Sequence, residues 1–449
     1  MTKALDATAR AQTVTPGLLR ILGISFGLAV IVGSTLGIGI LRTPGLVAAQ
    51  LGNRSAILTV WIVGGLYTLL GSVCLTELGT MLPRAGGYYV YARRAFGDTV
   101  GFAVGWTDWL TYCAVLGYVS IGMSEFVALL VPSLAGAVTA IASALLLGFV
   151  ALQWMGVRVS SRFQEIATAL KFVAFLALVA ACFAAAPRLA PAFGAGAALP
   201  SAPTLAGVIV ALQSVVITYG GWQSALYFTE EDRDPARNLP RSMIGGEMVV
   251  IGVYLLVNLA LLAVLPVPVL AGSTLPAADA AQIILGVRGA QTITLLSLIS
   301  LPPLLNAIMM IGTRILFAMG RDRLFWSRTA TINARGTPDV ATLVTTGVAI
   351  VLIASGTFQK LVAVASFFLA ANYAVCCLAL VVLRRREPGL ARPFRAWGYP
   401  WSAGIVLVGA ALFLIGVLAG DTANGLVALV LLTAGLAGRT ALARSAIAR

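Results

Sequence analysis

The chain has 449 residues, of which 59% are hydrophobic and only 10% charged, and its mean hydropathy is +0.97. About a quarter of the residues of an ordinary soluble protein are charged, so the composition excludes a soluble globular domain and indicates a membrane protein with many helical spans. The absence of histidine excludes His-dependent triads, His-ligated metals and histidine proton relays. The five cysteines all lie in apolar stretches, which predicts buried, reduced thiols and no disulfide-linked partner chain.

Twelve apolar segments follow one another along the chain, each close to or above the roughly 20 residues that an α-helix needs to cross a bilayer. They are 18–50, 55–81, 99–130, 133–154, 162–186, 203–230, 242–267, 291–318, 339–356, 359–383, 401–420 and 422–440. The polar residues ahead of the first segment contain no apolar stretch with a cleavage site, so we predict no cleavable signal peptide. The pattern predicts an all-α integral membrane protein with twelve transmembrane helices.

Positive charges alternate between the connecting segments. Of the 30 Lys and Arg residues, 24 lie in the N-terminal arm, the C-terminus and every second loop, 5 lie in the intervening loops, and Lys171 is the one left over. Cytoplasmic loops carry an excess of Lys and Arg, so we expect both termini in the cytoplasm. This alternation accounts for the net charge of +14 and argues against a nucleic-acid partner.

Glycine clusters interrupt the first and the sixth segments. Gly33, Gly37 and Gly39 lie close together in the first, and Gly220 and Gly221 are adjacent in the sixth. Glycine is costly in a continuous helix, and an unwound backbone in a bilayer is tolerated only where it is buried in protein or lines a cavity. Interrupted spans at corresponding positions in two halves of a chain point to the binding site of a transporter.

Four stretches of the sequence are similar to motifs of one transporter family. They are residues 37–44 (GIGILRTP), 77–91 (ELGTMLPRAGGYYVY), 219–240 (beginning YGGW, with TEE and NLP further on) and 313–322 (TR, followed by RD). One short glycine motif would be a weak signal, but four in the same order and spacing are specific. Over roughly residues 20–400 the chain therefore resembles the amino acid–polyamine–organocation (APC) superfamily, nearest its L-type amino acid transporter branch.

The resemblance implies a particular architecture. It implies a 5+5 inverted repeat in which helices 1 and 6 are broken, plus two C-terminal helices. We therefore expect an N-terminal cytoplasmic arm at 1–17, an inverted-repeat transport core at 18–400, and helices 11 and 12 with a cytoplasmic C-terminus at 401–449. The resemblance also implies alternating access to a central amino acid site.

The two breaks supply groups that suit an α-amino acid. The N-terminus of a half-helix offers unpaired N–H groups and a positive dipole end to a carboxylate, and the end of the preceding half-helix offers carbonyls to an ammonium. The predicted substrate-binding residues are Ser34, Thr35, Gly37, Ile38, Gly39, Ile217, Gly220, Gly221 and Gln223. The alternative for the glycines is a small-residue packing seam. Ile38, Ile217 and Gln223 depart from the residues that relatives often carry, which leaves the preferred substrate side chain open.

Lys171 is the candidate coupling residue. It is one of three lysines and lies inside the fifth apolar segment, where an ionisable side chain is a functional hypothesis by default. The resemblance implies that a lysine on helix 5 takes the place where sodium-coupled relatives bind sodium, and Gln164 and Thr168 fit that spacing. The ammonium would then act as a fixed charge or carry a transported proton. The alternative is snorkelling to the interface, which is strained because Lys171 lies about 13 Å along a helix beyond Arg162.

Acidic residues also fall within or beside the predicted spans. For Asp108, Glu125 and Glu247, near span ends, we expect interfacial solvation or an arginine partner. The carboxylates of residues 230–234 lie among arginines of the same loop, which predicts a local ion-pair network at the cytoplasmic face.

Together these features predict a secondary active transporter that moves an amino acid across the cell inner membrane, sodium-independently, as a proton symporter or an antiporter. One alternative keeps the fold and changes the cargo to a cationic amino acid or polyamine, which would need a carboxylate that the breaks lack. A second is a non-transporting amino acid sensor or channel. We expect no enzyme activity, catalytic site, metal site or cofactor. The expected partners are the amino acid, membrane lipids and, under proton coupling, protons.

Overall fold

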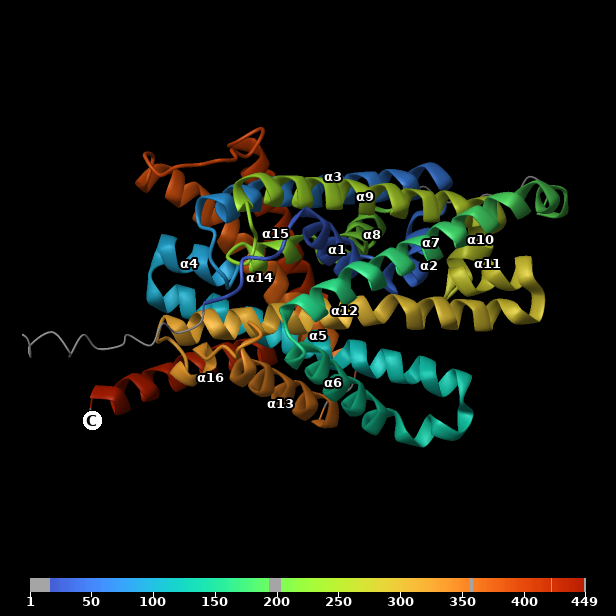
Figure 1. Ribbon diagram of the computed structural model, residues 1–449. Helices are drawn as coiled ribbons and strands as arrows, with labels where there is room; N and C mark the ends of the chain where they lie inside the picture. Colours follow the sequence, from blue (N-terminus) through green and yellow to red (C-terminus); the bar gives the residue numbers. More distant parts are fainter. Residues whose placement is uncertain (1–16, 194–202, 356–357, 421, 448–449) are drawn as a thin grey trace, which may run out of the picture.

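The computed structural model describes residues 17–193, 203–355, 358–420 and 422–447 (Figure 1). Within these ranges every regular element is a helix, and one isolated parallel bridge joins Leu22 to Asp232. The predicted all-α class is confirmed for this part of the chain.

Sixteen α-helices and four short 3₁₀ helices, labelled η, make up the described chain. They are α1 (Ile24–Thr35), α2 (Gly39–Leu51), α3 (Arg54–Met81), α4 (Tyr88–Phe96), α5 (Asp98–Leu130), η1 (Pro132–Ala137), α6 (Val138–Trp154), α7 (Val157–Phe193), α8 (Leu205–Thr218), η2 (Trp222–Phe228), α9 (Pro235–Val264), α10 (Val267–Gly272), α11 (Pro276–Leu285), η3 (Gly286–Arg288), α12 (Gly289–Arg321), η4 (Ser327–Ala330), α13 (Asp339–Ser355), α14 (Phe358–Arg386), α15 (Trp401–Gly420) and α16 (Thr422–Ile447).

The chain is a multi-pass membrane protein. Eight of its described helices are long and apolar enough to cross a bilayer, and the bent pair α1 and α2 would make a ninth span. Three shorter apolar helices, Asp339–Ser355, Trp401–Gly416 and Gly425–Arg439, fall where the ninth, eleventh and twelfth spans are predicted. The count of twelve spans stays a prediction.

Both predicted breaks are present. α1 ends at Thr35 and α2 begins at Gly39, with a bend of 47° between them. α8 ends at Thr218, and after a turn the chain continues as η2. Gly221 in this turn has a φ of +129°, a conformation that L side chains rarely adopt, so this position requires glycine.

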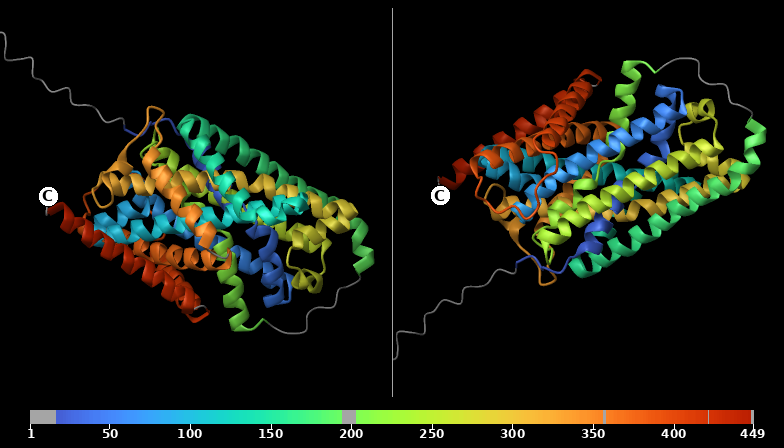
Figure 2. Two further views of the ribbon diagram at one scale, coloured as in Figure 1. Left: turned by 90° about the horizontal axis from the view of Figure 1, so that it is seen from below. Right: turned by 90° about the horizontal axis from the view of Figure 1, so that it is seen from above.

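Most of the long helices lie roughly along one common axis and pack side by side (Figures 1 and 2). α3 packs against α9, α5 against α12, and α6 against α13. These pairs correspond to predicted helices 2 and 7, 3 and 8, and 4 and 9, which an inverted repeat would relate. The repeat itself stays a prediction.

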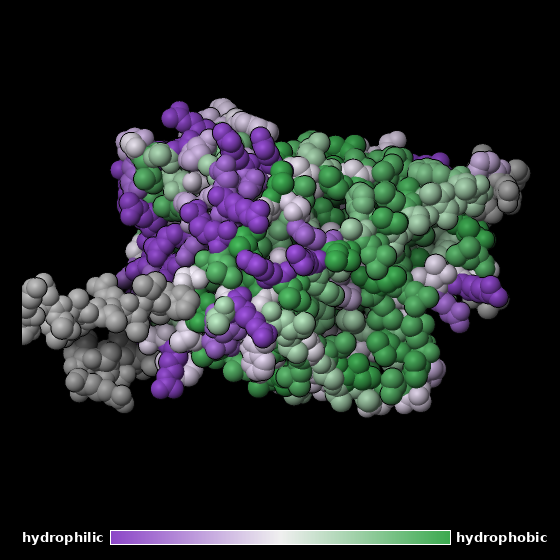
Figure 3. All heavy atoms as spheres, viewed as in Figure 1, coloured by the Kyte–Doolittle hydropathy of each residue, from purple (hydrophilic) through white to green (hydrophobic). Residues whose placement is uncertain are grey.

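Charged residues gather at one end of the molecule. Figure 3 shows hydrophilic side chains around the end that holds α4, while hydrophobic side chains cover much of the flank. We call this the arginine-rich end, because Arg84 and Arg93 pair there with Asp322, Arg94 with Glu387, and Arg321 with Glu230. Tyr89 of α4 donates to Asp322 over 3.0 Å, and burial together with this carboxylate raises the pKa of Tyr89.

The ion pairs of the 229–234 loop differ from the prediction. Glu231 forms a fully buried pair with Arg314, and Glu230 pairs with Arg321, so both partners come from α12 rather than from the same loop. Of the ion pairs that the carboxylates of residues 230–234 form in the described chain, only Asp234–Arg237 is local. The loop is therefore tied to α12, because its carboxylates point inward to a helix distant in sequence.

Of the three acidic residues for which we expected interfacial solvation or an arginine partner, two are placed differently from the prediction. Asp108 and Glu247 are fully buried, and no ion pair joins either to a lysine or arginine in the described chain. Each instead accepts a hydrogen bond from a hydroxyl, of Tyr227 and Thr68 respectively. Glu125 is exposed, as interfacial solvation predicts. Hydropathy places a residue along a helix but not around it, which is why the burial was missed.

Candidate functional site

The two breaks pack directly against each other. The hydroxyl oxygens of Ser34, in the last turn of α1, and Ser224, in η2, are 2.7 Å apart, and the Ser34 hydroxyl also lies 3.1 Å from the carbonyl of Gly221. A Cβ atom on Gly221 would come within 2.6 Å of the Thr35 hydroxyl and 2.9 Å of the Ser34 backbone. The absence of a side chain at Gly221 therefore allows the two unwound segments to meet.

One tyrosine joins the ends of both half-helices. The hydroxyl of Tyr254, in α9, lies 2.7 Å from the carbonyl of Thr35 and 2.9 Å from the carbonyl of Thr218. These residues end α1 and α8, where helical carbonyls lack intrahelical partners. α9 thereby holds the two C-terminal ends, with their free carbonyls, beside each other.

Gln223 connects the second break to two other helices. Its side-chain carbonyl accepts from the backbone N–H of Gly221 over 3.2 Å and from the Tyr373 hydroxyl over 3.1 Å. Its amide lies 3.5 Å from the hydroxyl oxygen of Tyr112. The amide thus fixes the turn at Gly221 and links it to α5 and α14.

Lys171 reaches the first break. Its ammonium donates to the carbonyl of Gly33 over 2.7 Å, and the side chain is fully buried. The described contact is with helix backbone rather than with an interface, so snorkelling does not account for its position. The Lys171 side chain is therefore anchored at a carbonyl of α1, two residues before the end of that helix.

The residues grouped with Lys171 by their spacing lie on the same face of α7. Gln164 and Thr168 both donate to the carbonyl of Ala29, over 3.2 Å and 3.0 Å. A Cβ on Gly33 would come within 2.4 Å of the Gln164 amide and 2.5 Å of the Thr168 hydroxyl. Gly33 is therefore small because polar side chains of α7 lie against α1 at this point.

The start of α2 packs on the end of α8. A Cβ on Gly39 would lie 3.1 Å from the methyl carbon of Thr218, and the hydroxyls of Thr43 and Thr218 are 2.8 Å apart. The first N–H groups of α2 therefore begin beside the last turn of α8. This juxtaposition brings a helix N-terminus, which suits a carboxylate, next to the carbonyl ends that suit an ammonium.

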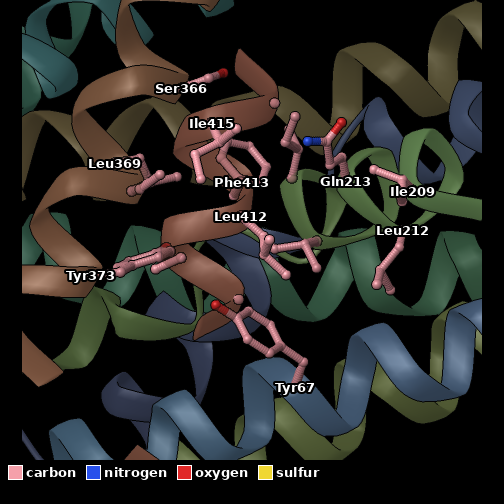
Figure 4. A pocket seen from close by; sticks show the side chains of 16 residues that line it. Tyr67, Ile209, Leu212, Gln213, Ser366, Leu369, Tyr373, Leu412, Phe413 and Ile415 are labelled. Atoms are coloured by element: carbon pink, nitrogen blue, oxygen red, sulfur yellow. The ribbon is translucent and has the colours of Figure 1, made fainter. Parts of the chain in front are cut away.

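A cavity of about 370 Å³ lies beside the second break (Figure 4). It is lined by α3, α8, α14 and α15, mostly with apolar side chains, and Ile217 and Tyr373 form part of its wall. Ile217 is 44% exposed. This predicted site residue therefore lies on the cavity side of α8 rather than between the two breaks.

The structure brings some of the predicted substrate-binding residues together and leaves others apart. Ser34, Thr35, Gly221 and Gln223 share direct contacts, and Gly39 begins α2 against α8. Three predicted residues, Gly37, Ile38 and Gly220, lie in the two unwound segments. None of them has a polar side chain that could bind a ligand.

Sequence reasoning missed four side chains of the site, which are Tyr112, Ser224, Tyr254 and Tyr373. Each of the four is a polar side chain inside an apolar span, which is the one signal that the sequence offers. Many polar residues in spans have only a packing role, so this signal does not identify site residues. Within the described chain no group of three or more His, Cys, Asp or Glu side chains is arranged to hold a metal ion.

Comparison with known proteins assigns the chain to a family. The sequence profile described as amino acid permease matches residues 23–436. The chain belongs to the amino acid permease family. This assignment confirms the resemblance to the APC superfamily and identifies a permease of the membrane rather than an enzyme.

Several curated relatives are L-type transporters. The chain is 25% identical over 424 residues to the serine/threonine exchanger SteT of Bacillus subtilis, covering 92% of this chain and 94% of the relative. It is 29% identical to the Asc-type amino acid transporter 1 of Mus musculus, over 83% of this chain and 72% of the relative. It is 27% identical to the b(0,+)-type amino acid transporter 1 of Mus musculus, over 91% and 84%.

Proposed function

We propose that the protein is a secondary active transporter that moves a neutral L-amino acid across the cell inner membrane by alternating access. The observation that carries this proposal is the pair of breaks packed face to face. The N-terminus of α2 would take the carboxylate, and the carbonyl ends of α1 and α8 at Tyr254 would take the ammonium. The names of the relatives, which are amino acid transporters and an exchanger, support the same class of cargo.

The placement of Lys171 supports the proposal that transport is independent of sodium. The Lys171 side chain on the Gly33 carbonyl would take the place of a bound cation between α1 and α7. Transport would then be a proton symport or an exchange. The arginine-rich end would face the cytoplasm, because cytoplasmic segments carry an excess of Lys and Arg, and both termini would lie on that side.

The first experiment identifies the substrate and tests the site. Purified protein is screened for thermal stabilisation by each of the twenty amino acids and by putrescine, since a ligand that binds the folded state stabilises it by mass action. Putrescine lacks a carboxylate, so we expect no stabilisation by it. Stabilisation by putrescine equal to that by the best amino acid would favour the polyamine alternative.

The second experiment tests the breaks. L-serine is the test substrate, because the relative SteT is named a serine/threonine exchanger. Gly39→Val should abolish uptake of radiolabelled L-serine into proteoliposomes, because a side chain there meets Thr218 and covers the start of α2. Gly148→Val is the matched control, since a Cβ at Gly148 meets nothing within 4 Å. Normal uptake by Gly39→Val would show that the substrate does not bind at this segment. Stabilisation without saturable uptake by the unmodified protein would favour the sensor alternative.

A further inference from the structure

Asp108 is a buried acid that the proposed site does not use. It lies about 15 Å along α5 from the first residue of that helix, which is about half the thickness of a bilayer core. Its side chain is fully buried. One carboxylate oxygen accepts from the Tyr227 hydroxyl over 2.8 Å, and the other, Oδ1, has no hydrogen-bond partner in the described chain.

Four tyrosines surround this carboxyl group. We call Tyr88, Tyr112, Tyr227 and Tyr373 the tyrosine cluster. The Tyr227 ring lies 5.7 Å from the Tyr88 ring and 5.5 Å from the Tyr112 ring, and Tyr88 lies 5.8 Å from Tyr373, measured between ring centroids. The cluster joins α4, α5, η2 and α14 around Asp108, so these elements must fit together for the carboxyl group to be enclosed.

The tyrosine cluster is continuous with the second break. Tyr112 lies one helical turn beyond Asp108 on α5, and both Tyr112 and Tyr373 contact the side-chain amide of Gln223. Gln223 in turn accepts from the N–H of Gly221. A change in how the cluster packs around Asp108 therefore acts on the side chain that fixes the turn at the proposed substrate site.

No positive charge pairs with this acid in the described chain. Arg93 and Arg94 of α4 pair with Asp98, Asp322 and Glu387, and Arg384 of α14 pairs with Glu77. Arg386 of α14 donates to the carbonyl of Ala95, and Arg385 is exposed. Of the elements packed on α5, α12 carries Arg314, which is paired with Glu231, and α16 carries Arg439, which lies over the Phe102 ring. α13 carries Asp339, which accepts from Thr331, while η1 and α6 have no ionisable side chain. The titratable groups that face Asp108 are Tyr88, Tyr112, Tyr227, Tyr373 and Cys376, and each of them is neutral or becomes negative.

An ionised carboxylate in this enclosure would be a buried, unpaired charge. Such charges are among the most costly arrangements in a protein, and those within membranes mark functional sites. The neutral acid fits the same space, because it needs one proton on Oδ1 and keeps the hydrogen bond from Tyr227. The closed cluster therefore suits the protonated form, whereas the ionised form requires contact with water.

We propose that Asp108 binds the proton that moves with the amino acid, and that closure of the tyrosine cluster requires this proton. A proton from water adds to the ionised carboxylate before the cluster closes, and the same proton returns to water when the cluster opens at the cytoplasmic side. The inference rests on the proposed transport function. It assigns the proton to α5 and leaves Lys171 as the anchor of α7 on the Gly33 carbonyl.

The test measures proton movement separately from substrate movement. Proteoliposomes that contain a pH-sensitive dye receive external L-serine, and internal acidification is recorded. In a parallel assay, exchange of external radiolabelled L-serine for internal L-serine is measured without a gradient. The variant is Asp108→Asn, because an amide has the shape and the donor of a neutral acid but cannot release a proton.

We expect Asp108→Asn to retain exchange within about threefold of the unmodified protein and to lose substrate-driven acidification. The comparison variant is Glu247→Gln, since Glu247 is equally buried and forms no ion pair in the described chain. Glu247→Gln should still show substrate-driven acidification. Acidification that persists in Asp108→Asn, or that is lost only in Glu247→Gln, would overturn the assignment. Asp108→Glu keeps a titratable group and should restore part of the proton movement.

The remaining outcomes also decide between the proposals. An unmodified protein that exchanges L-serine without moving protons is an exchanger, and the inference about Asp108 is then wrong while the proposed function stands. If no amino acid is exchanged at all, the proposed function itself fails. Thermal unfolding of Asp108→Asn checks that the variant is folded, so that a loss of acidification reports on the proton and not on the fold.

Discussion

The buried pair between Glu231 and Arg314 provides a quantitative test of how the arginine-rich end closes. The carboxylate accepts from Nε and Nη2 of Arg314, each over 3.0 Å, and both side chains are fully buried. Glu231→Gln leaves the guanidinium over the Phe228 ring, 5.4 Å from its centroid, without a counter-charge. Removing one partner of a buried pair costs about 3–5 kcal/mol.

This cost sets the expected effect on opening. If α12 and the 229–234 loop separate when the arginine-rich end opens, Glu231→Gln weakens the closed arrangement relative to the open one. A change of 1.4 kcal/mol is a factor of ten, so the population ratio should shift by roughly a hundredfold to a few thousandfold. The exposed pair Asp234–Arg237, 3.8 Å apart, is the control. Such pairs contribute about 0.2–1 kcal/mol, so Arg237→Gln should shift the ratio by a few-fold at most.

The assay is the rate at which a water-soluble thiol reagent labels a cysteine placed at Ser224, measured in inside-out vesicles. The five native cysteines are buried and give the background rate. We expect Glu231→Gln to raise the rate far above that of Arg237→Gln. Replacing both partners, with Glu231→Gln and Arg314→Met, removes the buried charge and should restore slow labelling in part. Equal rates in Glu231→Gln and Arg237→Gln would refute the view that this pair holds the end closed.

Three further predictions concern the site and the topology. Gly221→Ala should abolish L-serine exchange, because its Cβ would lie 2.6 Å from the Thr35 hydroxyl at a φ of +129°; exchange at the normal rate would show that the breaks do not meet in this way. Lys171→Met should reduce exchange strongly, and the rate in the unmodified protein should be the same in sodium and in choline buffers. Cysteines at Ser133 and Ser327, both exposed, should react with an impermeant reagent from opposite sides, with Ser133 outside; the reverse labelling would invert the proposed topology.

The breaks could be predicted from the sequence because backbone chemistry is local. A cluster of glycines within an apolar span lowers the cost of unwinding at that point and nowhere else, so Gly37 and Gly221 mark the sites where α1 and α8 end. Lys171 could be predicted for a related reason. A charge in the middle of an apolar segment must find a polar partner inside the protein, and here it finds the carbonyl of Gly33.

The partners across the fold could not be predicted in the same way. Ser34 and Ser224 are 190 residues apart in sequence, and neither stands out in its own segment. Glu231 lies close in sequence to Arg233 and Arg237, yet it binds Arg314 of α12, because burial favours the bidentate partner that the fold presents over the nearest one in sequence. Asp108 illustrates the same limit, since only the three-dimensional arrangement encloses it in tyrosines.

The geometry at Tyr254 indicates what a substrate ammonium would add at the joined ends of α1 and α8. Its hydroxyl lies within hydrogen-bond distance of two carbonyls, at Thr35 and Thr218, but a hydroxyl has a single proton to donate. The two half-helix ends therefore share one donor, while Lys171 already serves the carbonyl of Gly33. An ammonium carries three donors, so a bound α-amino group supplies what Tyr254 alone does not. The substrate would then stabilise the joined ends of α1 and α8 more than any side chain present, which is what coupling of substrate binding to closure requires.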